Sequence, residues 1–322
     1  MAEFSIIEEF CHGIGPDHAD TALGVGDDAA IVTVPQGYEL AISVDTMLAG
    51  VHFYADAAPA SIAHKLLAVN LSDMAAMGAN PKWATLTLSI PSADRSWLSA
   101  FSDSLKQICT QFGVQIIGGD TTQGPLNLSI NIMGLLPKGN ALCRHGAVLG
   151  DDVYVSHTLG DAALGLLCVQ GKLSLEKTHQ QALITALELP VPRVDLGQRL
   201  LGIANACLDV SDGLMGDLAH ICERSKVSIE LDINAIPISH AYQAYINQGG
   251  NLGLALDGGD DYELAFTANI NSRAEIDAIS NELGIRLSRI GRVTAPSNVK
   301  VAAFDQGAPY ELSTTDSFQH FS

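Results

Sequence analysis

The chain has 322 residues, 47% of them hydrophobic and 16% charged, so a well-buried globular protein is expected and two domains are favoured over one. Its formal net charge of −19 argues against nucleic acid or an anionic membrane as partner. The six cysteines form no CxxC pair, the N-terminus lacks a signal-peptide pattern, and no apolar run reaches membrane-spanning length. We therefore expect a cytoplasmic protein.

The first half of the chain alternates predicted strands and helices. Apolar or alternating runs predict strands at residues 38–44, 83–90 and 126–133. Helices are expected at residues 60–77 and 95–112, and the second carries an apolar stripe that core packing explains. Turn residues cluster at 137–140. They predict a domain boundary between residues 137 and 138, giving domains 1–137 and 138–322.

The second half is also mixed α and β. Strands are predicted at residues 152–156, 207–210, 227–231, 264–267 and 299–304. Helices are predicted at residues 162–169, 193–204, 273–283 and from about 214 to 225. No fixed-period repeat or long linker interrupts this pattern. The fold class is therefore α/β, or α+β, with two mixed domains.

Nine aspartates sit in short motifs punctuated by Gly, Ser or Asn, most of them after strand-like runs or on a helix. They are Asp27, Asp28, Asp45, Asp73, Asp120, Asp209, Asp212, Asp260 and Asp261. Like charges converge only where cations neutralise them, and Mg²⁺ with oxygen ligands commonly accompanies phosphates. The pattern favours phosphoryl chemistry at a multi-metal site.

Two familiar nucleotide motifs are absent. Residues 24–29 match G-x-G-x-x-A superficially, but the following stretch reads as a strand, whereas a dinucleotide-binding turn needs a helix there. Residues 165–172 have one residue too many for a P-loop and lack Ser or Thr after Lys172. Bound ATP phosphates would therefore need metal bridges, backbone amides and a few basic groups.

Several candidate residues can also be explained by a structural role alone. Asp209 and Asp212 give the sharpest signal, because helix capping explains one acid at a strand–helix turn but not two. The paired glycines before Asp120 could admit a phosphate or simply make a tight connection. Taken alone, Asp73 reads as a solvated helix residue, and Arg144 and His52 read as surface residues.

Six spaced motifs resemble those of bacterial thiamine-monophosphate kinases. In order they are residues 26–29 (GDDA), 43–45 (SVD), 68–78 (AVNLSDMAAMG), 117–121 (IGGDT), 209–214 (DVSDGL) and 258–264 (GGDDYEL). The likeness runs over nearly the whole chain. That family belongs to the ATP-binding superfamily that includes aminoimidazole ribonucleotide synthetase. The resemblance implies a homodimer whose N-terminal sheets pair into a β-barrel, with a larger C-terminal α/β domain completing the active site.

The resemblance also implies roles for individual residues. The magnesium ligands would be Asp28, Ser43, Val44 (through its carbonyl), Asp45, Asp73, Asp120, Asp209 and Asp212. ATP would contact Gly119, Asp120, Arg144 and Ser211. Thiamine monophosphate would contact His52, Asp260 and Phe318. Two positions depart from the family: Asp260 stands where Glu is usual, and Phe318 where Tyr or Trp is frequent.

The resemblance implies a phosphotransferase that makes thiamine diphosphate from thiamine monophosphate and ATP, with several Mg²⁺ ions. The acceptor oxygen is already anionic, so we expect direct in-line transfer, without an acid–base or covalent residue. Selenophosphate synthetase would need a reactive cysteine in a glycine-rich loop, and Cys11 lies in a helix-like stretch. The hydrogenase-maturation relatives would need a C-terminal cysteine, but the chain ends in Ser322. A non-catalytic nucleotide or metal sensor is the alternative from another class.

Overall fold

The computed structural model describes residues 3–310 and the side chains of residues 5–310. This part of the chain divides into two compact units. The first comprises residues 3–74 and 79–141, and the second comprises residues 75–78 and 142–310.

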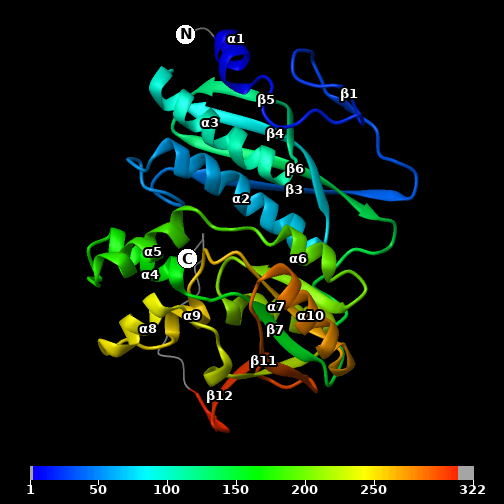
Figure 1. Cartoon of the computed structure of the whole chain (residues 1–322), viewed down its shortest axis with the longest axis vertical. Coiled ribbons are helices and arrows are strands. Elements are labelled where there is room, and N and C mark those ends of the chain that lie inside the picture. The colour runs from blue at the N-terminus through cyan, green and yellow to red at the C-terminus, as the bar shows by residue number, and fades with distance from the viewer. Residues whose placement is uncertain (1–2, 311–322) are drawn as a thin grey trace. The chain divides into compact units, whose positions relative to one another are not determined.

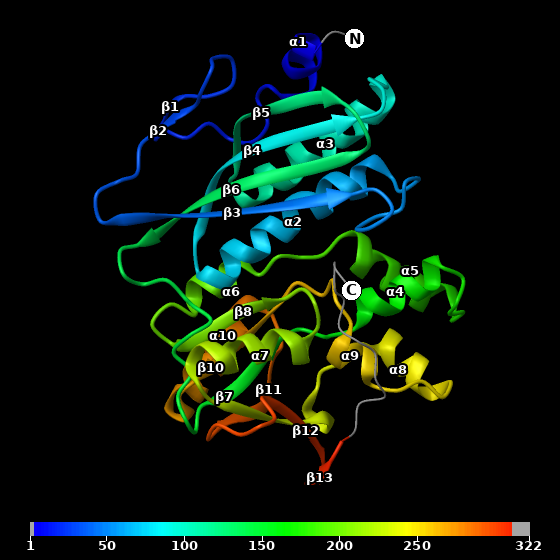
Figure 2. The ribbon, with the colours of Figure 1, turned by 180° about the vertical axis from the view of Figure 1, so that it is seen from behind.

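The first unit is built on a four-stranded sheet in the order β3-β6-β4-β5. Its strands are β3 (Tyr38–Leu48), β4 (Asn80–Ile90), β5 (Gln115–Gln123) and β6 (Asn127–Pro137). Helices α2 (Pro59–Met77) and α3 (Arg95–Phe112) cover one face of this sheet, as Figure 1 shows. Figure 2 looks onto the opposite face, which neither helix covers.

Helix α3 has clear sequence reasons for both of its ends. The Asp94 side chain caps the amide groups of Ser96 and Trp97, and Gly113 ends the helix in the left-handed conformation at φ 68°. Phe101, Leu105 and Ile108 of the predicted stripe are buried. Helix α3 therefore connects the parallel strands β4 and β5 in a β4–α3–β5 crossover.

The N-terminal segment wraps the edge of this unit. It contains α1 (Glu3–Ile6), a π-helical turn η1 (Ile7–Cys11), β1 (Thr21–Leu23) and β2 (Ile31–Val32). Burial raises the pKa of the Cys11 thiol to about 11, so it is protonated at neutral pH. This agrees with the rejection of Cys11 as a reactive thiol.

The second unit is built on a seven-stranded sheet in the order β13-β12-β9-β11-β7-β10-β8. Its strands are β7 (Asp152–Ser156), β8 (Ala204–Val210), β9 (Ser228–Asp232), β10 (Glu263–Ala268), β11 (Leu287–Thr294), β12 (Val301–Asp305) and β13 (Ala308–Pro309). Only β9 and β12 pair in parallel, and every other pair is antiparallel within the residues that the structure describes.

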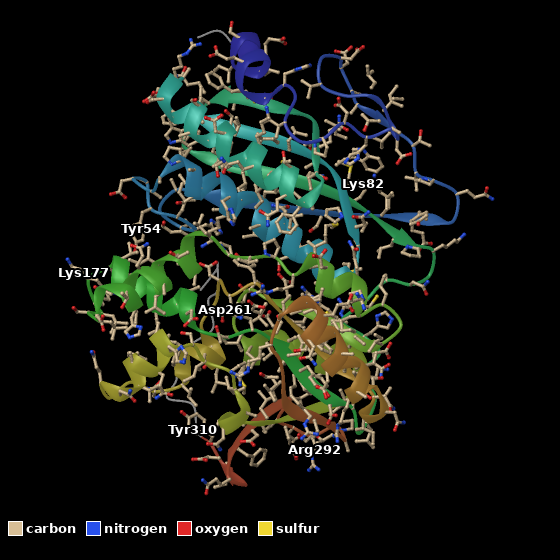
Figure 3. The ribbon with its side chains drawn as sticks, in the orientation of Figure 1. Tyr54, Lys82, Lys177, Asp261, Arg292 and Tyr310 are labelled. Carbon is tan, nitrogen blue, oxygen red and sulfur yellow. The ribbon has the colours of Figure 1, made fainter. Side chains whose placement is uncertain are left out.

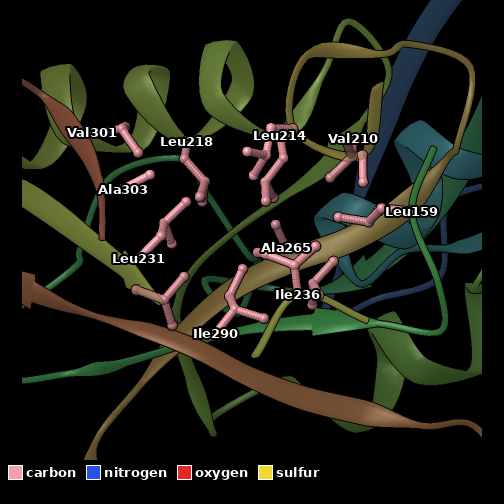
Figure 4. Packing of buried hydrophobic residues seen from close by; sticks show 14 of the residues in the cluster. Leu159, Val210, Leu214, Leu218, Leu231, Ile236, Ala265, Ile290, Val301 and Ala303 are labelled. Atoms are coloured by element: carbon pink, nitrogen blue, oxygen red, sulfur yellow. The ribbon is translucent and has the colours of Figure 1, made fainter. Parts of the chain in front are cut away.

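Helices flank this sheet. They are α4 (Asp161–Val169), α5 (Lys177–Glu188), α6 (Val194–Arg199), α7 (Leu214–Ser225), α8 (His240–Asn247), α9 (Gly253–Asp257) and α10 (Arg273–Leu283), with short 3₁₀ turns η2 (Ile233–Ala235) and η3 (Ile270–Ser272). Figure 4 shows the core, in which Leu214 and Leu218 of α7 pack with Ala265 of β10 and Ile290 of β11. This packing fixes the turn between β8 and α7.

The mixed α/β class is confirmed, but several predicted boundaries were wrong. Gly118, Gly119 and Asp120 were expected after a strand and lie inside β5, and Asp45 lies within β3 rather than at its end. The helix predicted at residues 193–204 ends at Arg199, and α5, α8, α9 and β11 were not predicted. The sheet of the first unit is open in the single chain, so the dimeric barrel stays a prediction.

No helix within residues 3–310 has the length and apolar character needed to span a membrane. The six cysteines are free.

Candidate functional site

In the first unit, one cluster of predicted metal ligands forms where β3 meets α2. The Ser43 hydroxyl donates a 2.5 Å hydrogen bond to Asp73 Oδ2. The Asp45 backbone amide donates to Oδ1 of the fully buried Asn70 (3.2 Å), whose Nδ2 donates to Leu66 O (2.8 Å). Asn70 thus ties the strand to the helix, and alternation along β3 puts the Asp45 side chain on the same sheet face as Ser43. The side-chain atoms that could bind a metal here are all oxygens, which suits a hard cation such as Mg²⁺.

Asp120 lies elsewhere on the same sheet. Strands β3 and β5 form opposite edges, three inter-strand spacings or about 14 Å apart. The pairing also places Asp120 in one row with Thr87, Ser129 and Thr46, on the face away from α2. Because a metal–oxygen bond is only about 2.1 Å long, Asp45 and Asp120 of one chain do not meet at one Mg²⁺ ion.

Gly119 has a structural reason to be glycine. A Cβ atom there would lie 1.8 Å from the backbone oxygen of Leu86 on β4. Close packing of β4 on β5 therefore explains this residue without a nucleotide, and its expected contact with ATP stays a prediction.

Asp28 and His52 lie in turns on either side of β3. Asp28 is exposed, and its amide donates to Asp27 Oδ1 (2.9 Å). The Leu48 amide donates to Nδ1 of His52 (3.0 Å), and the His52 amide donates back to Leu48 O (3.0 Å). Since Nδ1 accepts a hydrogen bond, the neutral ring carries its proton on Nε2. His52 can therefore present an N–H donor to an anionic ligand.

In the second unit, the turn between β8 and α7 is organised around a carboxylate that the sequence analysis did not single out. The backbone amides of Ser211, Asp212 and Gly213 all donate to Oδ2 of Asp217, at 3.0, 3.1 and 3.2 Å. Burial raises the pKa of Asp217 to about 6, although these amide donors act in the opposite direction. The protein's own carboxylate thus fills the amide nest at the start of α7. Any phosphate here must be held by other groups.

The predicted ligands surround this turn. Asp209 is buried near the end of β8, where it pairs with Leu264 of β10, while Ser211 is partly exposed and Asp212 is exposed. Gly213 must be glycine, because its φ is 122° and a Cβ would approach the Asp257 backbone to 2.7 Å. The acids at positions 209 and 212 are therefore fixed on a rigid strand–turn–helix junction.

The loop at residues 258–262 packs directly onto the same turn. The Asp260 amide donates to Ser211 O and the Tyr262 amide to Val210 O, both at 2.8 Å. Asp260 (φ 71°) and Tyr262 (φ 51°) both have left-handed backbones, and the Tyr262 hydroxyl donates to Asp260 Oδ1 (3.0 Å). A bulky residue in this conformation is strained, and such strain often accompanies functional sites. The structure thus brings Asp260 beside Ser211.

Asp261 has a different role from Asp260. Figure 3 labels Asp261 among the side chains of the second unit. The Asp261 Oδ2 atom accepts a 2.8 Å hydrogen bond from the amide of Gly160, the residue before α4. Desolvation raises the pKa of Asp261 well above its ordinary value, and nearby Asp161 adds to this shift. Glu263 is buried and held by a bidentate pair with Arg193 (2.7 and 2.5 Å). Both acids are therefore occupied by partners within the second unit.

Arg144 is exposed and lies away from the β8–α7 turn. The backbone oxygen of the preceding residue, Cys143, accepts a hydrogen bond from the Cys207 amide (2.9 Å), and Cys207 lies on β8 four residues before Ser211. At 3.3 Å per residue this separation is about 13 Å. Phe318 lies outside the described residues.

Within residues 3–310, no three His, Cys, Asp or Glu side chains are gathered closely enough to hold a metal ion. No role was assigned to Asp217 or Tyr262 from the sequence, and Asn70 was placed beside Asp73 on one helix face without its bond to Asp45 being predicted. Asp217 could have been found, because an acid in the first turn of α7 can reach back to the amide groups that precede the helix. Asn70 acts through a contact with Asp45, 25 positions away, and the bond of Tyr262 to Asp260 depends on left-handed backbones that no local pattern revealed.

Comparison with known proteins places the chain in a family. Residues 26–136 match the N-terminal domain model of AIR synthase related proteins, and residues 149–303 match the C-terminal domain model. The thiamine-monophosphate kinase of Salmonella typhimurium is 45% identical over 294 residues, covering 91% of this chain and 90% of the relative. The chain belongs to the thiamine-monophosphate kinase family.

Solved structures agree with this family. The thiamine-monophosphate kinase of Stenotrophomonas maltophilia is 42% identical, with a TM-score of 0.85 over 95% of this chain and 96% of that one. A structure described as "AaThiL complexed with AMPPCP and TMP" is 28% identical, with a TM-score of 0.78 over 99% of this chain and 95% of that one. The thiamine-monophosphate kinase fold therefore extends over nearly the whole chain.

Proposed function

We propose that the protein transfers the γ-phosphoryl group of ATP to thiamine monophosphate, giving thiamine diphosphate and ADP in thiamine diphosphate biosynthesis. The observation that carries this proposal is the near full-length similarity to thiamine-monophosphate kinases, one of them in a complex with AMPPCP and TMP. The acid-rich turns of both units are consistent with it, because they supply oxygen ligands for cations that accompany phosphates.

The transfer needs no covalent enzyme intermediate. A phosphate oxygen of thiamine monophosphate attacks the γ-phosphorus of ATP, and a new P–O bond forms while the bond to the β–γ bridging oxygen breaks. The electron pair leaves with ADP. Because the attacking oxygen is already anionic, the protein has only to align the reactants and offset their repulsion.

Magnesium, when bound, supplies the positive charge that lets the two anionic reactants approach each other. Its proposed ligands are Asp28, Ser43, the carbonyl of Val44, Asp45, Asp73 and Asp120 from the first unit, and Asp209 and Asp212 from the second. Ser43 and Asp73 support this assignment, since their hydrogen bond already holds two oxygen donors together. Gly119, Asp120, Arg144 and Ser211 are the proposed ATP contacts.

The acceptor has three proposed contacts. The Nε2–H of His52 is oriented by its Nδ1 bond to the Leu48 amide and is suited to donate to a phosphate. Asp260 is held by Tyr262 beside Ser211, and its carboxylate suits the cationic thiazolium group of the acceptor. Phe318 would stack on one of the rings of thiamine.

We also propose that the protein works as a homodimer whose N-terminal sheets close into a barrel. The uncovered sheet face of the first unit supports this, because Ile42 (61% exposed) and Val44 (59% exposed) lie on it. Closing two such sheets would bring β3 of one subunit beside β5 of its partner. The β3 backbone at Asp45 would then lie about one strand spacing, rather than three, from β5 of the partner subunit.

The function is tested by incubating the purified protein with ATP, Mg²⁺ and thiamine monophosphate and measuring both ADP and thiamine diphosphate. The two products should appear in equal amounts, and EDTA should stop the reaction. Thiamine and other phosphorylated acceptors serve as controls for specificity. Nucleotide binding without ADP release would instead favour a sensor and contradict the proposal.

A further inference from the structure

The side chains of Asp260 and Tyr262 contact each other in the loop between α9 and β10. The Tyr262 hydroxyl donates a 3.0 Å hydrogen bond to Asp260 Oδ1, and both residues are partly exposed. The residue between them, Asp261, is engaged elsewhere, because its Oδ2 accepts from the Gly160 amide (2.8 Å). The loop therefore uses Asp261 as an anchor and presents Asp260 and Tyr262 as a pair.

The backbone on which this pair stands is fixed against the β8–α7 turn. The amides of Asp260 and Tyr262 donate to Ser211 O and Val210 O, both at 2.8 Å. A Cβ at Gly259 would lie 2.6 Å from the same Ser211 oxygen, so the loop can approach this closely only because residue 259 is glycine. The backbone of Asp260 is thus held in place before any ligand arrives.

Both members of the pair are held in a strained conformation. Asp260 has φ 71° and Tyr262 has φ 51°. Residues other than glycine rarely adopt left-handed backbones, and a bulky Tyr does so less readily than Asp. Such strain persists only where surrounding contacts enforce it, and it is concentrated at ligand sites. The contact between Tyr262 and Asp260 is therefore associated with a local cost that ordinary loop packing does not explain.

The phenol restricts the Asp260 carboxylate without neutralising it. The terminal torsion of an Asp side chain is soft, so a carboxylate on a fixed backbone can still rotate. A hydrogen bond to Oδ1 limits this rotation. A Lys or Arg in the place of Tyr262 would also cancel the negative charge, whereas a neutral O–H donor leaves it in place. The result is a fixed negative charge that a cationic ligand can meet without reorganising it.

We propose that Tyr262 is a positioning residue, which holds Asp260 so that its carboxylate distinguishes a positively charged acceptor ring from a neutral one. The thiazolium ring of thiamine monophosphate carries such a charge. Because Coulomb attraction falls with distance, a carboxylate that rotates away into solvent would contribute less to binding. The Asp260 amide also bonds to Ser211, a proposed ATP contact, so the same loop sets the acceptor ring relative to the nucleotide.

This inference rests on the proposed kinase function and is tested with single and double variants. Tyr262→Phe removes the hydroxyl and keeps the ring, and Asp260→Ala removes the carboxylate. The two changes are also combined. Tyr245→Phe, at a partly buried position on α8, is the matched control.

The ligands are thiamine monophosphate and deazathiamine monophosphate, in which a neutral thiophene ring replaces the thiazolium. Calorimetry gives the affinity for each ligand, and steady-state kinetics gives kcat and the KM for each substrate. The melting temperature reports whether a variant remains folded.

Tyr262→Phe should weaken binding of thiamine monophosphate about tenfold and raise its KM by a similar factor, since a hydrogen bond to a charged group is lost. The affinity for the neutral analogue, kcat, the KM for ATP and the melting temperature should stay near those of the unmodified protein. In the Asp260→Ala background, Tyr262→Phe should have almost no further effect, because the hydroxyl acts through Asp260. Tyr245→Phe should change none of these quantities.

Three results would overturn the inference. Equal weakening of both ligands would show that ring charge is not what the pair recognises. Parallel losses in kcat, ATP binding and melting temperature would make the hydroxyl merely structural. A full effect of Tyr262→Phe in the Asp260→Ala background would mean that Tyr262 does not act through Asp260.

The binding measurements also separate this inference from the proposed function. If the unmodified protein prefers thiamine monophosphate over the neutral analogue and Tyr262→Phe removes that preference, the inference stands even where no thiamine diphosphate forms. If thiamine diphosphate forms but the preference is the same in both proteins, the inference fails and the function stands. Binding of neither ligand would overturn the inference.

Discussion

At the scale of single residues, the carboxylate of Asp217 does what a bound phosphate does in many nucleotide sites. It gathers three successive backbone amides at the start of a helix. The nest is therefore structural, and it holds Ser211 and Asp212 so that their side chains are available to ligands. Asp217 is a positioning residue.

The first prediction separates this positioning role from simple stability. Asp217→Asn keeps an oxygen that can accept the three amides, so unfolding free energy and activity should stay close to those of the unmodified protein. Asp217→Ala leaves the amides without their acceptor and should cost about 2–4 kcal/mol in urea unfolding. In Asp217→Ala, kcat/KM for ATP should fall by at least tenfold at temperatures where the protein is still folded. Equal activity in both variants would show that Asp217 does not position the site.

The second prediction concerns Asp261 and pH. Its pKa is raised in the folded state, so the folded protein keeps a proton that the unfolded chain releases near the ordinary value of 3.8. Stability from this group is therefore present at low pH and is lost as pH rises above about 4. Asp261→Asn cannot ionise and keeps an oxygen to accept from the Gly160 amide.

The variant should consequently become more stable relative to the unmodified protein as pH rises from 4 towards 8. Urea unfolding at several pH values measures this difference, with Asp103→Asn on the surface of α3 as control. A difference that is constant across pH would contradict the proposed desolvation of Asp261.

The sequence revealed the acids of the candidate site better than the residues that support them. Asp209, Ser211 and Asp212 stood out because strand, turn and helix patterns meet there within six residues. Asn70 was predicted to share a helix face with Asp73, but its bond to the Asp45 amide joins residues 25 positions apart in the sequence. Such contacts depend on how the chain folds back, which local patterns do not encode.

At the scale of elements, the 3.6-residue periodicity predicted helix α3 correctly, whereas the glycines at positions 118 and 119 led to a wrong end for strand β5. The bounds of α3 were predicted correctly because its apolar stripe, Asp94 cap and Gly113 terminator agree. Gly118 and Gly119 follow the apolar run at residues 114–117 and were expected to form a phosphate-binding turn or a tight connection. The structure continues the strand, because β4 approaches so closely at Gly119 that no side chain fits.

The third prediction tests this close approach with two neighbouring glycines. Gly119→Ala would put its Cβ 1.8 Å from Leu86 O, whereas the nearest atom to a Cβ at Gly118 is Thr85 Cγ2 at 3.9 Å. Gly119→Ala should lower the free energy of unfolding by more than about 2 kcal/mol, and Gly118→Ala by less than about 1 kcal/mol. Similar losses in urea unfolding for both variants would mean that β4 and β5 are not paired in this register.

At the scale of the whole molecule, the distribution of acids over the first sheet argues for more than one chain. Asp45 and Asp120 lie on opposite edge strands and opposite faces of a four-stranded sheet. If both bind the same magnesium ions, the two residues come from different subunits. Sequence motifs alone could not reveal this, because they give the order of the ligands and not their separation across strands.

The last prediction tests the shared site by mixing two inactive variants. Asp45→Asn and Asp120→Asn should each reduce turnover at least 100-fold with little change in melting temperature. If each site takes Asp45 from one subunit and Asp120 from its partner, a mixed dimer has one site with both acids and one with neither. Random re-association of equal amounts makes half of the dimers mixed, so activity should recover to about a quarter of the unmodified level. If tagged subunits show that mixed dimers form but activity does not recover, both acids act within a single chain.

The control is to add Ile42→Asp to both variants. A charge on the uncovered sheet face should keep the subunits apart and abolish the recovery.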